Sequence, residues 1–190
     1  MMPSRAALEG FRGHTLPDLL GLDVRLLFVG INPGLLTAAV QAHFARRGNR
    51  FYPALFRAGI VDRLIDASQG YDADDLEQLI ARGIGITNLV PEATARADEL
   101  ARADLEAGAL RLEDLVGRIQ PRAVAILGVT AYRTAFARPK AVVGRQPETL
   151  AGKQLWVVPN PSGLNAHATP ETLATAYEEV ALAAGLTLYR

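Results

Sequence analysis

Short apolar runs alternate with longer amphipathic segments along this chain, and this alternation predicts strands separated by helices. A short apolar run that is rich in β-branched or aromatic side chains is typical of a strand buried on both faces. Runs of this kind predict strands at Arg25–Ile31, Gly85–Val90, Ala123–Gly128 (after Pro121) and Gln154–Val158.

Apolar positions at helical spacing, bounded by glycine or proline, predict the helices between these strands. The longest is Asp98–Ile119, where leucines recur on one face and Gly108 is expected to interrupt the helix. A short helix is also expected near Leu16–Leu20. The other predicted helices are Asn49–Gly59, Asp74–Arg82, Thr130–Ala137 and Pro170–Ala184.

Strands that alternate with helices form a mainly parallel sheet covered on both faces. We therefore predict a three-layer, doubly wound α/β domain with a central, mainly parallel four-stranded sheet. Residues 1–23 are expected to be an N-terminal lead-in and residues 24–190 a single domain. Ligands of such sheets bind beyond the carboxyl ends of the strands. The residues that follow the strands should therefore meet on one rim; they are Asn32, Asn88, Gly128 and Asn160.

Composition narrows the class of protein. Hydrophobic residues make up 49% of the chain, there are no cysteines, and the formal net charge is zero. Disulfides and thiolate chemistry are therefore excluded. Charged residues interrupt every apolar run long enough to be considered for a membrane span, and the N-terminus lacks the pattern of a signal peptide. We expect a cytoplasmic, prokaryote-like (nucleoid-associated) protein that does not bind a membrane.

The charge is unevenly distributed along the chain. Residues 24–61 contain five arginines and no acid, and residues 115–170 contain seven basic residues and one acid. Both segments include one of the polar turns considered below. An anionic substrate would be favoured there despite the zero net charge.

Asn32 stands in a tight Asn-Pro-Gly turn at the end of the first predicted strand. It can be an ordinary turn residue. It can also hold a water molecule, because a carboxamide oxygen accepts a hydrogen bond and fixes the line of attack, although it is no effective base near neutral pH. An aspartate there would also stabilise a developing cation. Asparagine has no charge and cannot provide that stabilisation. We therefore predict a slow enzyme that depends on a good leaving group.

The segment after this turn contains an aromatic and a basic cluster. Phe44 is either a core residue or a platform on which a planar base stacks. Arg46 and Arg47, together with Arg50, form either a solvated loop or a phosphate contact. Asn49 can cap the following helix.

A second turn, PNPSGLN at residues 159–165, follows the last predicted strand, and its two prolines cannot continue a sheet ladder. Gly163 allows close approach of the backbone to a ligand. Leu164 either packs under the next helix or acts as a wedge that fills the gap left by an extruded nucleotide. Ser162 can donate to a phosphate or hold the turn.

Other chemistries fit poorly. The chain lacks the glycine-rich phosphate-binding motifs, and its three histidines lack metal-ligand spacing, so we expect neither a cofactor nor a metal ion. His43 is expected to be a surface or loop histidine, and it is assigned no role. Glu92, after the second strand, is either a solvent-facing acid or an accessory carboxylate that supplies the charge Asn32 lacks.

Five motifs, in order, resemble the mismatch-specific uracil/thymine-DNA glycosylases of the uracil-DNA glycosylase superfamily. They are GINPG (30–34), HFARRGNRFY (43–52), ITNLV (86–90), AILG (125–128) and PNPSGLN (159–165). The resemblance implies a doubly wound domain that acts on uracil opposite guanine without metal or cofactor. Two residues after the turn's leucine, where relatives often have a basic residue, this chain has Ala166.

The resemblance also implies roles for individual residues. The water-positioning asparagine falls on Asn32, the base-stacking aromatic on Phe44 and the intercalating wedge on Leu164. Backbone groups around Ile31 and Phe44 would then contact the edge of the base. The resemblance gives Asn88 no secure role, and we expect it to bind the base because of its place on the rim. The DNA backbone is expected to contact Ser162, Gly163, Asn165, Arg46 and Arg47.

The resulting hypothesis is a monofunctional DNA glycosylase, acting as a monomer on double-stranded DNA that contains a mismatched or damaged pyrimidine. It would flip the base, hydrolyse the N-glycosidic bond and leave an abasic site. No lysine is placed to form a Schiff base, so strand cleavage is not expected. The alternatives are a non-catalytic protein that binds damaged DNA and a hydrolase of free nucleosides.

Overall fold

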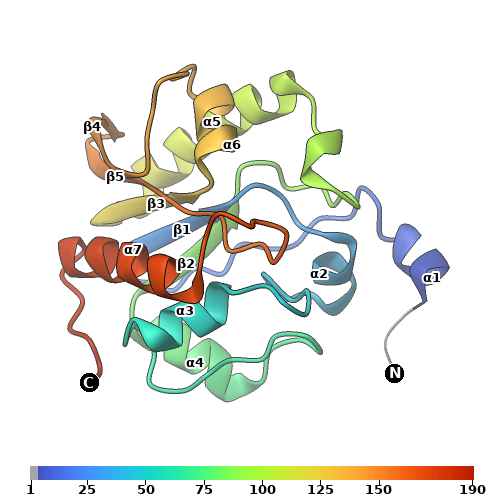
Figure 1. The fold of residues 1–190 in the computed structure, drawn as a ribbon, viewed down its shortest axis with the longest axis horizontal. Coiled ribbons are helices and arrows are strands. Elements are labelled where there is room, and N and C mark those ends of the chain that lie inside the picture. The colour runs from blue at the N-terminus through green and yellow to red at the C-terminus, as the bar shows by residue number, and fades with distance from the viewer. Residues whose placement is uncertain (1–3) are drawn as a thin grey trace.

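A five-stranded sheet forms the centre of the protein in the computed structural model, which describes residues 4–190 (Figure 1). The strands lie in the order β2-β1-β3-β5-β4. Four of them run parallel, and β4 pairs antiparallel with β5 at one edge. Their bounds are Leu26–Gly30 (β1), Ile84–Asn88 (β2), Ala123–Leu127 (β3), Gly144–Leu150 (β4) and Lys153–Val158 (β5).

Helices cover both faces of the sheet, which confirms the predicted three-layer, doubly wound α/β class (Figure 1). One face is covered by α3 (Phe51–Arg57), α4 (Ala73–Ala81) and α7 (Pro170–Ala183). The other is covered by α5 (Arg102–Ile119) and α6 (Val129–Ala135). No helix within residues 4–190 is long and apolar enough to cross a membrane.

The prediction of four strands is wrong, because β4 was missed. The sequence of β4, GRQPETL, has no apolar run, and only two of its residues are buried. Its register with β5 shifts between Arg145 and Thr149, the stretch that contains Pro147. Proline is tolerated in an edge strand at such an irregularity. An edge strand of this kind lacks the hydrophobic pattern by which the four parallel strands were recognised.

Strands β1 and β3 are apolar throughout because both of their faces are buried. Along β1, Leu26 and Phe28 pack with α3, α4 and α7, whereas Leu27 and Val29 pack with α5 and α6. All four side chains are fully buried. Polar side chains are therefore confined to the strand ends, where the chain turns.

Two of the helix predictions need correction. Residues 16–20 form no helix but an extended segment, while two short helices, α1 (Arg5–Glu9) and α2 (Leu35–Val40), were missed. Gly108 does not interrupt α5. A Cβ at Gly108 would collide with the carbonyl oxygen of Leu89, so glycine is needed there to bring the helix against the chain after β2.

Several contacts attach the segment before β1 to the domain. Thr15 forms an antiparallel bridge with Glu92, and Leu19 forms one with Ile86 of β2. The carbonyl oxygen of Pro17 lies 3.1 Å from Nε2 of His43. His43 lies in a turn but is only 2% exposed, so of the two expected positions, surface or loop, the surface position is wrong.

Burial lowers the pKa of the His43 imidazole to about 4, although the Pro17 carbonyl acts in the opposite direction. In the unfolded chain the ring titrates near its ordinary pKa of about 6.5. As the pH falls from about 6.5 towards 4, the unfolded chain therefore binds a proton that the folded protein does not bind. This lowers the free energy of unfolding in that window, and the effect is absent above it.

We therefore expect His43→Gln to lose less stability on acidification than the wild type. Between pH 7.5 and 5.0, urea unfolding should show that the wild type loses roughly 2 kcal/mol more than the variant. His167 is exposed, so His167→Gln is the matched control and should retain the loss seen in the wild type. Equal losses of stability in the wild type and in His43→Gln would contradict the lowered pKa of His43.

Candidate active site

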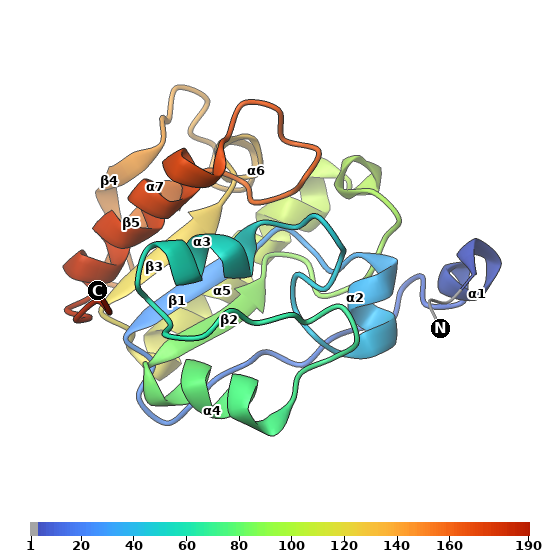
Figure 2. The ribbon, with the colours of Figure 1, turned by 60° about the horizontal axis from the view of Figure 1, so that its bottom comes forward.

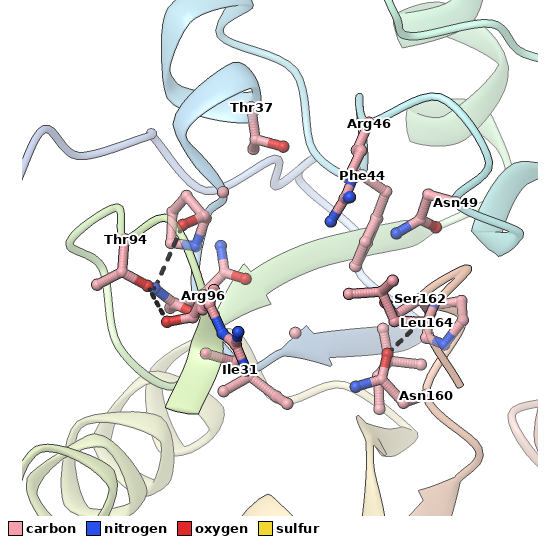
Figure 3. A pocket seen from close by; sticks show the side chains of 18 of the residues that line it. Ile31, Thr37, Phe44, Arg46, Asn49, Thr94, Arg96, Asn160, Ser162 and Leu164 are labelled. Atoms are coloured by element: carbon pink, nitrogen blue, oxygen red, sulfur yellow. Dashed lines mark hydrogen bonds between the residues drawn. The ribbon is translucent and has the colours of Figure 1, made fainter. Parts of the chain in front are cut away.

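A cavity of about 330 Å³ opens at the carboxyl ends of the parallel strands (Figure 3). The chain leaves β1 towards β2 on one side and later enters β3 on the other, so the cavity lies at the topological switch point of the sheet. It is lined by Gly30 at the end of β1, Asn88 of β2, Leu127 of β3 and Asn160 after β5. Of the residues predicted to meet on this rim, only Gly128 does not line the cavity.

The side chain of Asn32 is held at the cavity wall by its amide nitrogen. Nδ2 donates to the Thr94 hydroxyl at 2.8 Å, to the Glu92 carbonyl at 3.1 Å and to the Pro33 carbonyl at 3.2 Å. Carbonyl oxygens only accept hydrogen bonds, so this end of the carboxamide must be the NH₂ group. Within residues 4–190 no donor reaches Asn32 Oδ1, which is therefore left free to accept from a ligand or water.

The loop after β2 provides this support. Pro33 O accepts from Thr94 N–H at 3.2 Å, and the Thr94 hydroxyl donates to the Arg96 carbonyl at 2.8 Å. Because that hydroxyl proton is used, the oxygen must receive the hydrogen bond from Asn32. The Glu92 side chain is exposed and does not line the cavity; only its carbonyl contributes. Glu92 is thus placed as a backbone support for Asn32.

Phe44 lines the cavity from the wall opposite Thr94 and Arg96 (Figure 3). Its ring packs on Phe51 with centroids 4.1 Å apart and planes 31° apart. Its backbone φ is +56°, an uncommon value for a bulky residue. Two hydroxyls hold the preceding residue: Tyr71 accepts from His43 N–H at 3.1 Å and Tyr52 donates to the His43 carbonyl at 3.0 Å.

Asn88 is oriented by His43. Nε2 of His43 faces the Pro17 carbonyl, so it carries the ring proton and leaves Nδ1 as an acceptor. Nδ2 of Asn88 lies 3.5 Å from that Nδ1. Asn88 Oδ1 lies beside Gly30, where a Cβ would collide with it. Ile31 also lines the cavity, and its carbonyl already accepts from Val90 N–H at 2.9 Å.

The turn after β5 is held in shape by its own amides. Asn160 Oδ1 accepts from Ser162 N–H at 2.9 Å, and Asn165 Nδ2 donates to the Asn160 carbonyl at 3.0 Å. Ser162 Oγ accepts from Leu164 N–H at 3.3 Å. The Leu164 side chain is 76% exposed and lines the cavity mouth. The alternative that it packs under the following helix is therefore not the arrangement in the structure.

Gly163 closely approaches the backbone of another loop. A Cβ built there would lie 2.7 Å from the carbonyl oxygen of Gly48. The glycine therefore allows the turn after β5 to rest on the loop that precedes α3.

The predicted basic cluster separates into three different environments. Arg46 is exposed and lines the cavity, and Arg47 is exposed but does not line it. Arg50 donates to main-chain carbonyls of the turn after β5. Asn49 both lines the cavity and accepts from Phe51 N–H at 2.9 Å at the start of α3.

Several residues at the cavity were not singled out from the sequence. Thr94, Arg96 and Asp98 form one wall, with Arg96 Nη2 and an Asp98 carboxylate oxygen 2.5 Å apart. Hydrogen bonding from Arg96 lowers the pKa of the Asp98 carboxyl. The one sequence signal for these residues was their position soon after the end of a strand. From the sequence alone, that signal led only to Glu92. His43 was missed because burial of a loop histidine leaves no local pattern.

The comparisons with known proteins agree with the fold. The model of the family described as "Uracil DNA glycosylase superfamily" matches residues 17–181. A solution NMR structure of a "putative Uracil DNA glycosylase" from Methanosarcina acetivorans is similar with a TM-score of 0.59 and 17% sequence identity, covering 92% of this chain and 98% of that chain. An identity this low supports the fold alone, whereas the family match extends over most of the chain. The chain belongs to the uracil DNA glycosylase superfamily.

Proposed function

We propose that this protein is a monofunctional DNA glycosylase of the mismatch-specific type, which removes uracil or a related damaged pyrimidine opposite guanine and leaves an abasic site. Membership of the superfamily supports a DNA glycosylase. The proposed reaction rests mainly on the position of Asn32 Oδ1. This atom is a free acceptor fixed at the wall of a cavity that is also lined by an aromatic ring.

Asn32 acts on the attacking water. Its Oδ1 accepts a hydrogen bond from the water and directs the oxygen at the sugar C1′ atom. The C1′–O bond forms as the C1′–N1 bond breaks, the bonding electrons leave with the base as an anion, and the water gives up a proton to solvent. No step needs Asn32 to take a proton, which a carboxamide does poorly.

The flipped base is recognised by the cavity wall opposite Thr94 and Arg96. Phe44, rigidly packed on Phe51, provides a face on which a pyrimidine stacks. Asn88, with its NH₂ group turned to His43, presents Oδ1 as an acceptor beside Gly30. Uracil carries an imide N–H that such an acceptor suits, and the Ile31 side chain contacts the base at the cavity wall.

Double-stranded DNA is the proposed partner, bound by one monomer. Leu164, exposed at the cavity mouth, fills the gap left by the flipped nucleotide and offsets part of the lost stacking. Arg46 at the cavity and the exposed Arg47 are placed for phosphates, as are the polar groups of Ser162 and Asn165.

The direct test is excision from an end-labelled G·U duplex, followed by alkali. Alkali breaks the strand at an abasic site, so cleavage at the uracil position requires glycosylase activity on DNA. A protein that only binds damage would shift the duplex without alkali-labile product, and a nucleoside hydrolase would release base only from free nucleosides. An intact duplex at high enzyme excess would overturn the proposal.

Asn32→Ala should lower the single-turnover rate on the G·U duplex by about a hundredfold, because the water loses its positioning group. Duplex affinity should stay within about twofold, since Asn32 contributes little to DNA contacts. Turnover equal to wild type would move the catalytic role to another residue.

Thr94 is expected to support Asn32 through its hydroxyl alone. Thr94→Val, which keeps the shape and removes the acceptor, should lower the single-turnover rate about tenfold, the value of roughly one hydrogen bond. Thr94→Ser keeps the hydroxyl and should stay close to the wild-type rate. If both variants lose activity equally, the Thr94 hydroxyl is not the support of Asn32.

Leu164→Ala should slow excision from the duplex about tenfold or more, because the lost wedge no longer offsets unstacking. Excision from a single-stranded oligonucleotide, which has no partner strand or stacked duplex to oppose flipping, should change little. The ratio of the two single-turnover rates is the readout. Equal losses on both substrates would rule out a wedge.

A further inference from the structure

We propose that Arg50 is a positioning residue for the DNA wedge: its guanidinium group holds the loop of residues 160–168 so that Leu164 projects from the cavity mouth. This inference rests on the proposed function for its consequence in catalysis. The clamp itself rests on contacts within the protein, and it has a test of its own.

The Arg50 side chain reaches main-chain carbonyls along the whole loop. Nη2 donates to the Ser162 carbonyl at 2.6 Å and to the Asn165 carbonyl at 2.9 Å, and Nη1 donates to the Ala168 carbonyl. The backbone N–H of Arg50 donates to the Pro161 carbonyl at 2.9 Å. One residue therefore bonds both ends of the loop and its middle.

A guanidinium group suits this arrangement better than any other side chain. Its planar set of N–H donors can serve several carbonyls at once, whereas a lysine ammonium is a compact point charge. Among the described residues no carboxylate pairs with Arg50, and its Nε is buried without a partner. The carbonyl dipoles of the loop are therefore what compensates the partly desolvated charge, which makes these hydrogen bonds strong.

The loop and the segment of Arg50 lie side by side in both views of the fold (Figures 1 and 2). The close approach of Gly163 to the Gly48 carbonyl is a second contact between them. Because the Leu164 side chain is 76% exposed, protein packing cannot fix its position. That position must come from the backbone of the loop, and Arg50 is the side chain that joins this backbone to the start of α3.

The first test is amide hydrogen exchange of the free protein, which needs no DNA. Amides of Ser162, Leu164, Asn165 and His167 are hydrogen-bonded within the loop and report on its order. In Arg50→Met their exchange should rise about tenfold, and Arg50→Lys should give an intermediate rise. Amides of the central strands should be unchanged.

Arg57→Met is the matched control for this test. Arg57 is an exposed arginine of α3 whose partner, Glu171, lies in α7, so the variant removes the same charge nearby without touching the loop. Its loop exchange should equal that of wild type. Unchanged loop exchange in Arg50→Met, or an equal rise in Arg57→Met, would overturn the clamp; so would a rise spread evenly over the whole chain.

The second test asks whether Arg50 acts through Leu164. Arg50→Met should slow excision from a G·U duplex about tenfold and leave single-stranded excision within about twofold. The double variant Arg50→Met/Leu164→Ala should be no slower on the duplex than Leu164→Ala alone, because the wedge is then already lost. The positioning role would be overturned if the rate losses of the two single variants multiplied in the double variant. It would also be overturned if Arg50→Met slowed excision equally on the duplex and on single-stranded DNA.

The two tests separate this inference from the proposed function. If the wild type excises uracil from neither DNA, the proposed function fails while the exchange experiment still decides on the clamp. If the wild type is active and the Arg50 variants show neither effect, the clamp fails and the proposed function stands.

Discussion

Burial of the parallel strands on both faces is the constraint from which the rest of the structure follows. Leu26, Leu27, Phe28 and Val29 are fully buried, so β1 has no position for a polar side chain until it ends. The same holds for β3, whose residues are all buried. Polar chemistry is thereby forced to the carboxyl ends, where Asn32, Asn88 and Asn160 meet although they are far apart in sequence.

At that edge the groups are held in place before any ligand arrives. Asn32 is fixed by the loop after β2, Phe44 by Phe51 and by the hydroxyls that hold His43, and the turn after β5 by Asn160 and Arg50. The proposed mechanism, in which Asn32 positions water without activating it, depends on such rigidity, because placement supplies most of what the residue would contribute. Some of these supports are local, such as Asn160 for Ser162, but Thr94 and Arg50 lie 62 and 112 residues from the groups they contact. These parts of the site exist only in the folded chain.

This distance also explains which features could be predicted from the sequence. The four parallel strands, the fold class and the meeting of the three asparagines follow from local hydrophobic pattern and from the geometry of parallel sheets. The environment of Arg50 could not be predicted, because the nearest carbonyl that its guanidinium group contacts lies 112 residues away in the sequence. From the sequence alone, a basic loop is equally typical of a phosphate contact. The burial of His43 depends likewise on Pro17 and Asn88, and β4 was hidden by its polar, proline-containing edge sequence.

The carbonyl oxygens that hold Asn32 restrict what the position can become. Glu92 O and Pro33 O both face Nδ2, and an aspartate there would place a carboxylate oxygen against two carbonyl lone pairs. Substituting the acid would therefore rotate the side chain or raise its pKa instead of simply adding a negative charge beside the sugar. A carboxylate could take the present place of the Asn32 carboxamide only if the backbone after β2 changed at the same time, so the shape of that loop favours an amide at this position.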